Sequence, residues 1–267
     1  MPPDPAWHWR RRLLGAGGSL ALAGSLAGCG LFKSHRSGES ASLGEAGERR
    51  QVTPFSASPP NGEIPGGWRI SGFWNSKRRT QFRTVSERDT TILEAEAQQS
   101  ASGLFCSVNI AAEQAQRLRW RWRTRELLPQ GDVSRPAHDD AVARLIVSFD
   151  GPAQALSFKD MLFREQALLF GGIDLPHSML IYVWDTHLPV NSIFGINETT
   201  RIKYLVVESG DRHLGDWVHY ERDIRLDFLN AFGEAHGNVL NVGVTADTND
   251  TQGYALSYFG DIRIDAA

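Results

Sequence analysis

The sequence predicts a mainly β protein, an antiparallel β-sandwich of the jelly-roll type with two short helices. Short segments rich in β-branched and aromatic residues recur from residue 68 to residue 264, in alternating or continuous apolar patterns. Glycine, proline, asparagine and aspartate separate these segments, as they do between neighbouring strands. The segments do not alternate regularly with helices, so the pattern argues against a parallel βαβ sheet.

The expected strands follow one another closely along the body of the chain. With 267 residues, of which 41% are apolar and 10% aromatic, the chain is long enough to cover a large core. The strands are expected at 68–74, 80–86, 90–97, 103–110, 117–125, 143–149, 179–185, 202–209, 216–223, 239–247 and 253–264.

Two helices are expected to interrupt the strands. The first starts after Ser157, which with Asp160 forms a capping box, and stops at Gly171. The second is capped by Asp223 and ends at Gly233. Its expected apolar side carries Leu226, Leu229 and Phe232.

The segment "RLRWRWRTR" (117–125) alternates most regularly. Leu118, Trp120, Trp122 and Thr124 fall on one face, and five arginines fall on the other. One interpretation is an arginine-lined surface for an anionic ligand such as an acidic glycan or phosphate. The other is a buried tryptophan face whose arginines pair with acids of a neighbouring strand, for which Glu94 and Glu96 are candidates.

The amino end predicts export and lipid attachment. A basic stretch, "HWRRR", precedes an apolar run that is too short to span a membrane and ends in Leu26-Ala27-Gly28-Cys29. This motif resembles the bacterial lipobox, which predicts a signal peptide at 1–28 and lipidation of Cys29. Residues 10–14, "RRRLL", resemble a twin-arginine export signal, so both general and twin-arginine export stay open.

The predicted organisation is a signal peptide (1–28), a lipidated cysteine with a flexible tether (29–66) and a β-sandwich domain (67–267). The tether is rich in serine, glycine, glutamate and proline and shows no apolar period. We therefore expect a bacterial envelope protein, anchored in the membrane by lipid and facing the periplasm or the exterior. The net charge of −3 does not favour nucleic-acid binding. Cys106 is expected to be a buried apolar residue.

Four blocks of the body resemble a bacterial family known as domain of unknown function 3047. They are "DDAVARLIVSF" (139–149), "IYVWD" (181–185), and residues 207–234 and 242–264. The resemblance covers most of 68–264 and implies a β-sandwich similar to carbohydrate-binding modules. It implies no activity, substrate or catalytic residue.

The sequence does not favour an enzyme. It lacks the nucleophile elbow G-x-S-x-G, a phosphate-binding loop, H-E-x-x-H and C-x-x-C, and its histidines do not have metal-ligand spacing. A polysaccharide hydrolase or lyase remains the alternative, because carboxylates follow several strands. These are Asp150, Asp185 and Glu208, and two further candidates, Glu221 and Asp223, share one face of a strand.

A calcium site is a further hypothesis, since clustered oxygen ligands suit this cation. Asp247, Asn249 and Asp250 follow one strand, and Asp139 and Asp140 precede another. The alternative is an aspartate- and asparagine-rich turn whose side chains bond their own backbone.

A glycan-binding surface needs aromatic platforms with polar groups beside them. The candidates are Tyr182, Trp184, Asp185, Arg144 and Trp217, with core packing of the aromatic residues as the alternative. We therefore expect a non-catalytic, glycan-binding envelope lipoprotein, with the enzyme or an assembly lipoprotein that binds a protein partner as alternatives. Glycan binding predicts an exposed tryptophan in a groove, catalysis a cleft with paired carboxylates, and assembly a broad exposed apolar patch.

Overall fold

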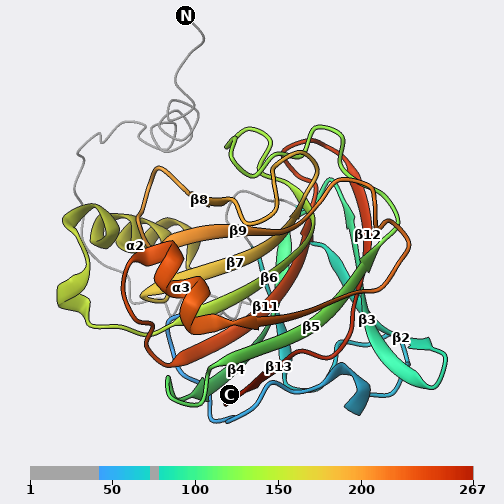
Figure 1. Cartoon of the computed structure of the whole chain (residues 1–267), viewed down its shortest axis with the longest axis horizontal. Coiled ribbons are helices and arrows are strands. Elements are labelled where there is room, and N and C mark those ends of the chain that lie inside the picture. The colour runs from blue at the N-terminus through green and yellow to red at the C-terminus, as the bar shows by residue number, and fades with distance from the viewer. Residues whose placement is uncertain (1–41, 73–77, 267) are drawn as a thin grey trace, which may run out of the picture. The chain divides into compact units, whose positions relative to one another are not determined.

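The computed structural model describes residues 42–72 and 78–266. Their strands form two curved sheets that face each other, as Figure 1 shows, and the predicted β-sandwich is confirmed. The larger sheet has the order β1 (Trp68–Gly72), β4 (Ser102–Ile110), β11 (Val239–Asp247), β6 (Ala141–Phe149), β7 (Ser178–Asp185), β9 (Ile202–Ser209) and β8 (Ile193–Gly195).

The smaller sheet carries the arginine-rich strand. Its order is β10 (Val218–Asp223), β5 (Arg117–Thr124), β12 (Tyr254–Phe259), β3 (Thr90–Gln98) and β2 (Gln81–Glu87), and β13 (Arg263–Asp265) also pairs with β5.

Three details differ from the sequence prediction. The pairing of β7 with β9 is parallel, because the chain crosses over between them through the short strand β8, which was not predicted. The expected strand 253–264 is two strands, β12 and β13, separated by residues 260–262. Two short 3₁₀ helices, η1 (Phe55–Ala57) and η2 (Ala153–Ala155), complete the described elements.

The main core lies between the sheets and is built on aromatic side chains. Trp120 and Trp122 of β5 point inward, as the alternation predicts, with 3% and 0% of their surface exposed. Their ring centroids lie 5.6 Å apart in an edge-to-face arrangement, the geometry that aromatic quadrupoles prefer. Cys106 is buried in the same core, as expected.

Both predicted helices form where their caps place them. Helix α2 (Phe158–Gly171) has the complete Ser157–Asp160 capping box, and its C-cap is Gly172, one residue after the predicted stop, with a φ of 65° that suits a residue without a Cβ. Helix α3 (Ile224–Phe232) is capped by the Asp223 side chain. Within the described residues, neither these helices nor any other is long and apolar enough to cross a membrane.

Helix α2 covers the outer face of the larger sheet. Its Phe163 and Ala167 join a second apolar cluster with outward-facing residues of β7 and β9, including Ile181 and Val206. Strand β7 is therefore covered on both faces and buried along its whole length.

The segment 42–66, predicted to be part of the tether, packs against the sandwich instead. Leu43, Val52 and Phe55 are 3%, 7% and 0% exposed, and the Phe55 ring lies 4.7 Å from that of Trp68. The backbone N–H of Leu43 donates to the carbonyl of Asp174 at 2.9 Å. A few widely spaced apolar residues are enough to hold this segment against the sandwich, although its sequence has no apolar periodicity that would predict this packing. Cys29 and the predicted signal peptide lie outside the described residues.

Candidate functional site

Tyr182 and Trp184, predicted as ligand platforms, are core residues. Both point from β7 into the space between the sheets and are 0% and 1% exposed. The Tyr182 ring lies 5.2 Å from Trp120, and the Trp184 ring lies 6.4 Å from Trp122. Burial, with the nearby charge of Asp227, raises the pKa of Tyr182 well above its usual value. The platform interpretation is therefore wrong for these two residues, because no ring face reaches the surface.

The Asp185 carboxylate is buried and accepts hydrogen bonds from two loops, so it does not face a ligand. One carboxylate oxygen accepts hydrogen bonds from the backbone N–H groups of His187 and Leu188, both at 2.7 Å. The other accepts from the backbone N–H of Val133 at 3.1 Å, and the residue is 1% exposed. Its oxygens are thus used in holding the loop ends beside β7.

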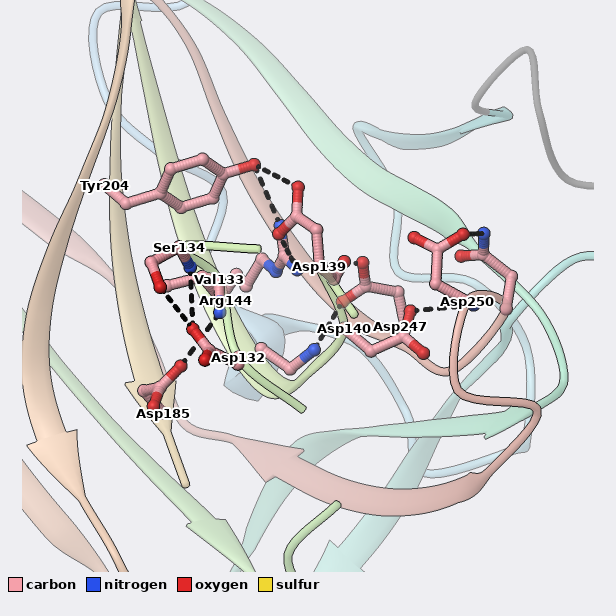
Figure 2. A network of polar contacts seen from close by, with 12 residues as sticks. Asp132, Val133, Ser134, Asp139, Asp140, Arg144, Asp185, Tyr204, Asp247 and Asp250 are labelled. Carbon is pink, nitrogen blue, oxygen red and sulfur yellow. Dashed lines mark hydrogen bonds and ion pairs between the residues drawn. The ribbon is translucent and has the colours of Figure 1, made fainter. Parts of the chain in front are cut away.

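Arg144 lies inside the carboxylate cluster that the sequence suggested for calcium (Figure 2). Its Nη2 atom lies 2.9 Å from Asp139 Oδ1 and 3.1 Å from Asp247 Oδ2. Its Nη1 atom donates to the Tyr204 hydroxyl, which in turn donates to Asp139. The guanidinium supplies the positive charge that the calcium hypothesis assigned to a metal ion.

The remaining members of the cluster form a turn that is held by Asp140 from the start of another strand, rather than by side chains that bond their own backbone. Asp140 accepts hydrogen bonds from the backbone N–H groups of Asp250 and Thr251, at 3.2 and 2.6 Å, and from the Thr251 hydroxyl at 2.7 Å. The Asn249 side-chain amide donates to the Asp250 carboxylate at 3.0 Å. No group of three or more histidine, cysteine, aspartate or glutamate side chains is arranged to hold a metal ion in the part of the chain that the structure describes.

Three carboxylates in this network, those of Asp139, Asp247 and Asp250, have raised pKa values, and burial is the main cause. Burial raises the pKa of Asp247 and of Asp139, and the Arg144 charge opposes the rise in both. The pKa of Asp250 rises to about 6 through burial and the charges of Asp140 and Asp139. The network is a structural junction of loops around one buried arginine, and it joins residues that the sequence had assigned to two separate sites.

The outer face of the smaller sheet displays the arginines of β5. Arg117 and Arg119 pair with Glu221 of β10, and Arg119 also lies 2.7 Å from Asp265. Arg123 pairs with Glu87 at 3.1 Å. The partners are therefore not the predicted Glu94 and Glu96, which lie 2.5 and 4.0 Å from Arg83 of β2. The reason is strand order, since β12 lies between β5 and β3, and Arg83 of the neighbouring strand β2 stands directly opposite Glu94.

Trp217, the one predicted ligand residue outside these buried networks, lies on this outer face. The guanidinium carbons of Arg121 and Arg123 lie 4.4 and 4.8 Å from its ring centroid, within cation–π range. Its indole N–H donates a hydrogen bond to the Glu87 carboxylate. Glu87 also accepts hydrogen bonds from Nη1 and Nη2 of Arg123. We call Arg121, Arg123 and Trp217 the arginine–tryptophan platform.

A groove of about 500 Å³ adjoins the platform at Arg121. It opens where β12 ends at Phe259 and β13 begins at Arg263, because Arg121 stands opposite the gap. A Cβ at Gly260 would lie 2.4 Å from the Arg121 Nε atom, so this glycine leaves room for the arginine. The groove is lined by Thr90, Thr91, Arg119, Trp120, Arg121, His219, Tyr220, Glu221, Asp261 and Arg263.

Arg121 and Arg263 leave positive charge available in the groove. Neither has a carboxylate partner within ion-pair distance among residues 42–72 and 78–266, whereas Arg117, Arg119 and Arg123 are paired. An arginine fork without a carboxylate partner can take a carboxylate, sulfate or phosphate oxygen from a ligand. The sequence signal for Arg121 was the arginine alternation itself, but nothing distinguished it from its paired neighbours.

The carboxylates considered for catalysis are held by other groups. Arg119 and Arg117 hold the pKa of Glu221 below its usual value, and Arg225 with two backbone N–H groups does the same for Asp223. Asp150 accepts from the backbone and side chain of Asn238 at 2.6 and 2.9 Å. Glu208 accepts from the Tyr220 hydroxyl at 2.7 Å. Each of these carboxylates thus has a structural partner.

Comparison with known proteins gives a family and distant structural likenesses. The model of the family described as "Protein of unknown function (DUF3047)" matches residues 66–263. None of the curated proteins matches the sequence.

Two of the similar solved structures are binding domains of other proteins. The cleaved adhesin domain of Lys-gingipain from Porphyromonas gingivalis has 10% identity and a TM-score of 0.37, covering 81% of this chain and 98% of that one. The family 30 carbohydrate-binding module of a Clostridium thermocellum cellulosomal cellulase has 11% identity and a TM-score of 0.32, covering 83% and 96%. Likenesses this distant carry no information about ligand or activity.

Proposed function

The chain belongs to the DUF3047 family, and because the family's description assigns no activity, we propose a function from the geometry of the smaller sheet. The domain is a non-catalytic glycan-binding module of an exported envelope protein that is anchored in the membrane through lipidated Cys29. The arginine–tryptophan platform and its groove form the binding site.

The observation that carries this proposal is half-buried Trp217 on the outer face of the smaller sheet, beside Arg121, which lines the groove. The C–H faces of sugars pack against aromatic rings, and guanidinium groups donate to hydroxyl and carboxylate oxygens. Arg121 serves both parts of the site, since it contacts the Trp217 ring and lines the groove. The pairing of Arg123 with Glu87 holds the second guanidinium and the indole N–H in fixed positions, which lowers the entropy lost on binding.

The enzyme alternative is less well supported, because the carboxylates proposed for it are hydrogen-bonded or ion-paired as described above. A glycosidase acid must stay protonated near neutral pH, whereas the partners of Glu221 and Asp223 favour the ionised form.

Retention on polysaccharides tests the proposal. The full chain is applied to a panel of immobilised neutral and acidic polysaccharides, and release of reducing ends is measured in the same tubes. Trp217→Ala and Arg121→Ala should each weaken retention by about tenfold, the order expected for one stacking or charge-assisted contact. Arg69→Ala, an exposed arginine on β1 of the other sheet, is the matched control and should bind like wild type.

Three results would contradict the proposal. Equal retention of all variants would show that the arginine–tryptophan platform does not bind the polysaccharide. Release of reducing ends would show that the protein cleaves its ligand. Failure of wild type to bind any member of the panel would refute glycan binding. The anchor is tested separately, since Cys29→Ala should abolish acyl labelling of the protein.

A further inference from the structure

Helix α2 carries a large apolar surface on the side that faces away from the sheet. Phe158, Leu169 and Leu162 are 78%, 73% and 46% exposed. Phe158, Leu162 and Leu169 share one side of the helix by their spacing, with Met161 and Leu168 beside them. The opposite side, with Phe163 and Ala167, packs on the larger sheet. A surface helix normally presents polar residues to water, so an apolar outer side indicates an occupant other than water.

The chain enters the described structure beside this helix. The Ser42 hydroxyl donates to the Asp174 carboxylate, and the Leu43 N–H donates to the Asp174 carbonyl, both at 2.9 Å. Asp174 follows α2 closely and lies 3.8 Å from Arg164 of the helix. The point at which the amino-terminal segment joins the domain is therefore next to α2.

Only residues 30–41 separate Ser42 from the predicted lipidated cysteine, Cys29. A chain of this length reaches at most about 45 Å when fully extended. That is close to the diameter expected for a folded domain of this size. An acyl group on Cys29 would thus keep the α2 side of the domain within reach of the bilayer.

The two outer faces of the sandwich are consequently different. Helix α2 lies on the outer face of the larger sheet, whereas the arginine–tryptophan platform lies on the outer face of the smaller sheet. If α2 contacts a membrane, the platform points away from it, toward a ligand in solution or on another surface.

We propose that the outer side of α2 docks on the lipid bilayer as a second, non-covalent anchor, in addition to the lipid on Cys29. This inference rests on the lipid anchor of the proposed function. Phe158, Leu162 and Leu169 insert at the boundary of headgroups and acyl chains, and exposed Lys159 contacts anionic headgroups. Exposed Glu165 lies among the apolar residues and limits the insertion to headgroup depth.

A second anchoring element has a physical consequence. Apolar side chains that insert at the interface add to the membrane affinity that a lipid anchor provides. A helix that lies in the interface also fixes the orientation of the domain, which a lipid attached at a single point does not. The apolar face of α2 is thereby assigned to lipid rather than to a protein partner.

Vesicle binding by the unlipidated full chain tests the inference. Cys29→Ala removes the covalent anchor, and co-sedimentation is measured with vesicles of phosphatidylethanolamine and phosphatidylglycerol. In this background, Phe158→Ser with Leu169→Ser should lower partitioning by about a hundredfold, about tenfold for each buried side chain. The matched control is Leu226→Ser with Leu229→Ser on α3, where the leucines are 57% and 49% exposed. This control should sediment like the parent.

Folding and self-association are followed in the same samples. Both double variants replace exposed side chains, so unchanged tryptophan fluorescence and melting temperature are expected and confirm that they are folded. If the parent does not bind vesicles, or if both double variants bind equally well, the inference is wrong. If the parent is a dimer that Phe158→Ser/Leu169→Ser converts to a monomer without changing sedimentation, the occupant is a second copy and the inference is also overturned.

The proposed glycan site is distinguishable from this surface. Trp217→Ala should weaken polysaccharide retention but keep vesicle binding, and Phe158→Ser/Leu169→Ser should show the reverse. A protein that binds vesicles through α2 yet retains no polysaccharide would support the membrane inference and refute the proposed ligand.

Discussion

Replacing Asp160 should destabilise the protein through a single buried carboxylate. Asp160 is 1% exposed and completes the capping box of α2 with Ser157. Its other oxygen accepts from the Thr199 hydroxyl at 2.6 Å and from the Thr200 N–H at 2.7 Å. It therefore ties the start of α2 to the residues that precede β9.

The magnitude follows from these hydrogen bonds. A helix cap contributes about 1 kcal/mol, and each hydrogen bond to an ionised group about 1.5 kcal/mol. Asp160→Ala should thus lower the free energy of unfolding by about 4 kcal/mol at neutral pH. For a domain of this size, that loss corresponds to a fall in melting temperature of about 10 °C.

The pH dependence tests the role of charge. Although burial opposes it, donation from Ser157, Thr199 and Thr200 holds the pKa of Asp160 well below its usual value. The unfolded chain then binds the proton more readily, so this stabilisation is present above about pH 4 and disappears as pH falls toward the folded-state pKa. Asp160→Asn should therefore differ most from wild type above pH 4 and progressively less below it.

Denaturant unfolding followed by tryptophan fluorescence measures both effects. Glu165→Gln removes an exposed carboxylate from the same helix and should change stability by less than about 0.5 kcal/mol. An Asp160→Asn variant as stable as wild type at pH 7, or a difference that stays constant down to pH 3, would refute the reasoning.

Three further outcomes are expected. Arg144→Met should lower the free energy of unfolding by about 3–5 kcal/mol in chemical denaturation, because it leaves Asp139 and Asp247 without their buried counter-charge; a neutral effect would contradict the ion network. Calcium and chelator should give the same melting temperature, since Arg144 supplies the cluster's positive charge, and a rise of several degrees with calcium would restore the metal hypothesis. Burial and the charge of Arg201 lower the pKa of His177, so stability should fall as pH drops below about 6.5. His177→Gln should flatten this part of the stability–pH curve, and an unchanged curve would assign the effect to another group.

Local patterns in the sequence predicted much of the fold. The capping pair Ser157–Asp160 and the cap Asp223 gave the helix starts, because caps depend on residues within one turn. The alternation of 117–125 placed Trp120 and Trp122 inside and the arginines outside, because side chains alternate along any strand. These features need no knowledge of distant residues.

Local patterns failed where burial depends on the second layer. Tyr182 and Trp184 share a strand face in either interpretation, and only the opposing sheet makes that face the core. On α3 the expected apolar side was Leu226, Leu229 and Phe232, yet the structure buries Ile224 and Phe228 and leaves both leucines exposed. Helical spacing alone did not decide which apolar residues face the sandwich.

The sequence by itself determined the family, the sandwich class, the helix caps and the inward and outward faces of the arginine strand. Tertiary structure decided which charged groups meet: Arg144 with Asp139 and Asp247, and Arg83 rather than the arginines of β5 with Glu94. It also decided that the gap between β12 and β13 opens a groove at Arg121. The physical reason is that alternation, capping and turns act over a few residues, whereas ion pairing and grooves depend on strand order and register, which bring together residues far apart in the chain.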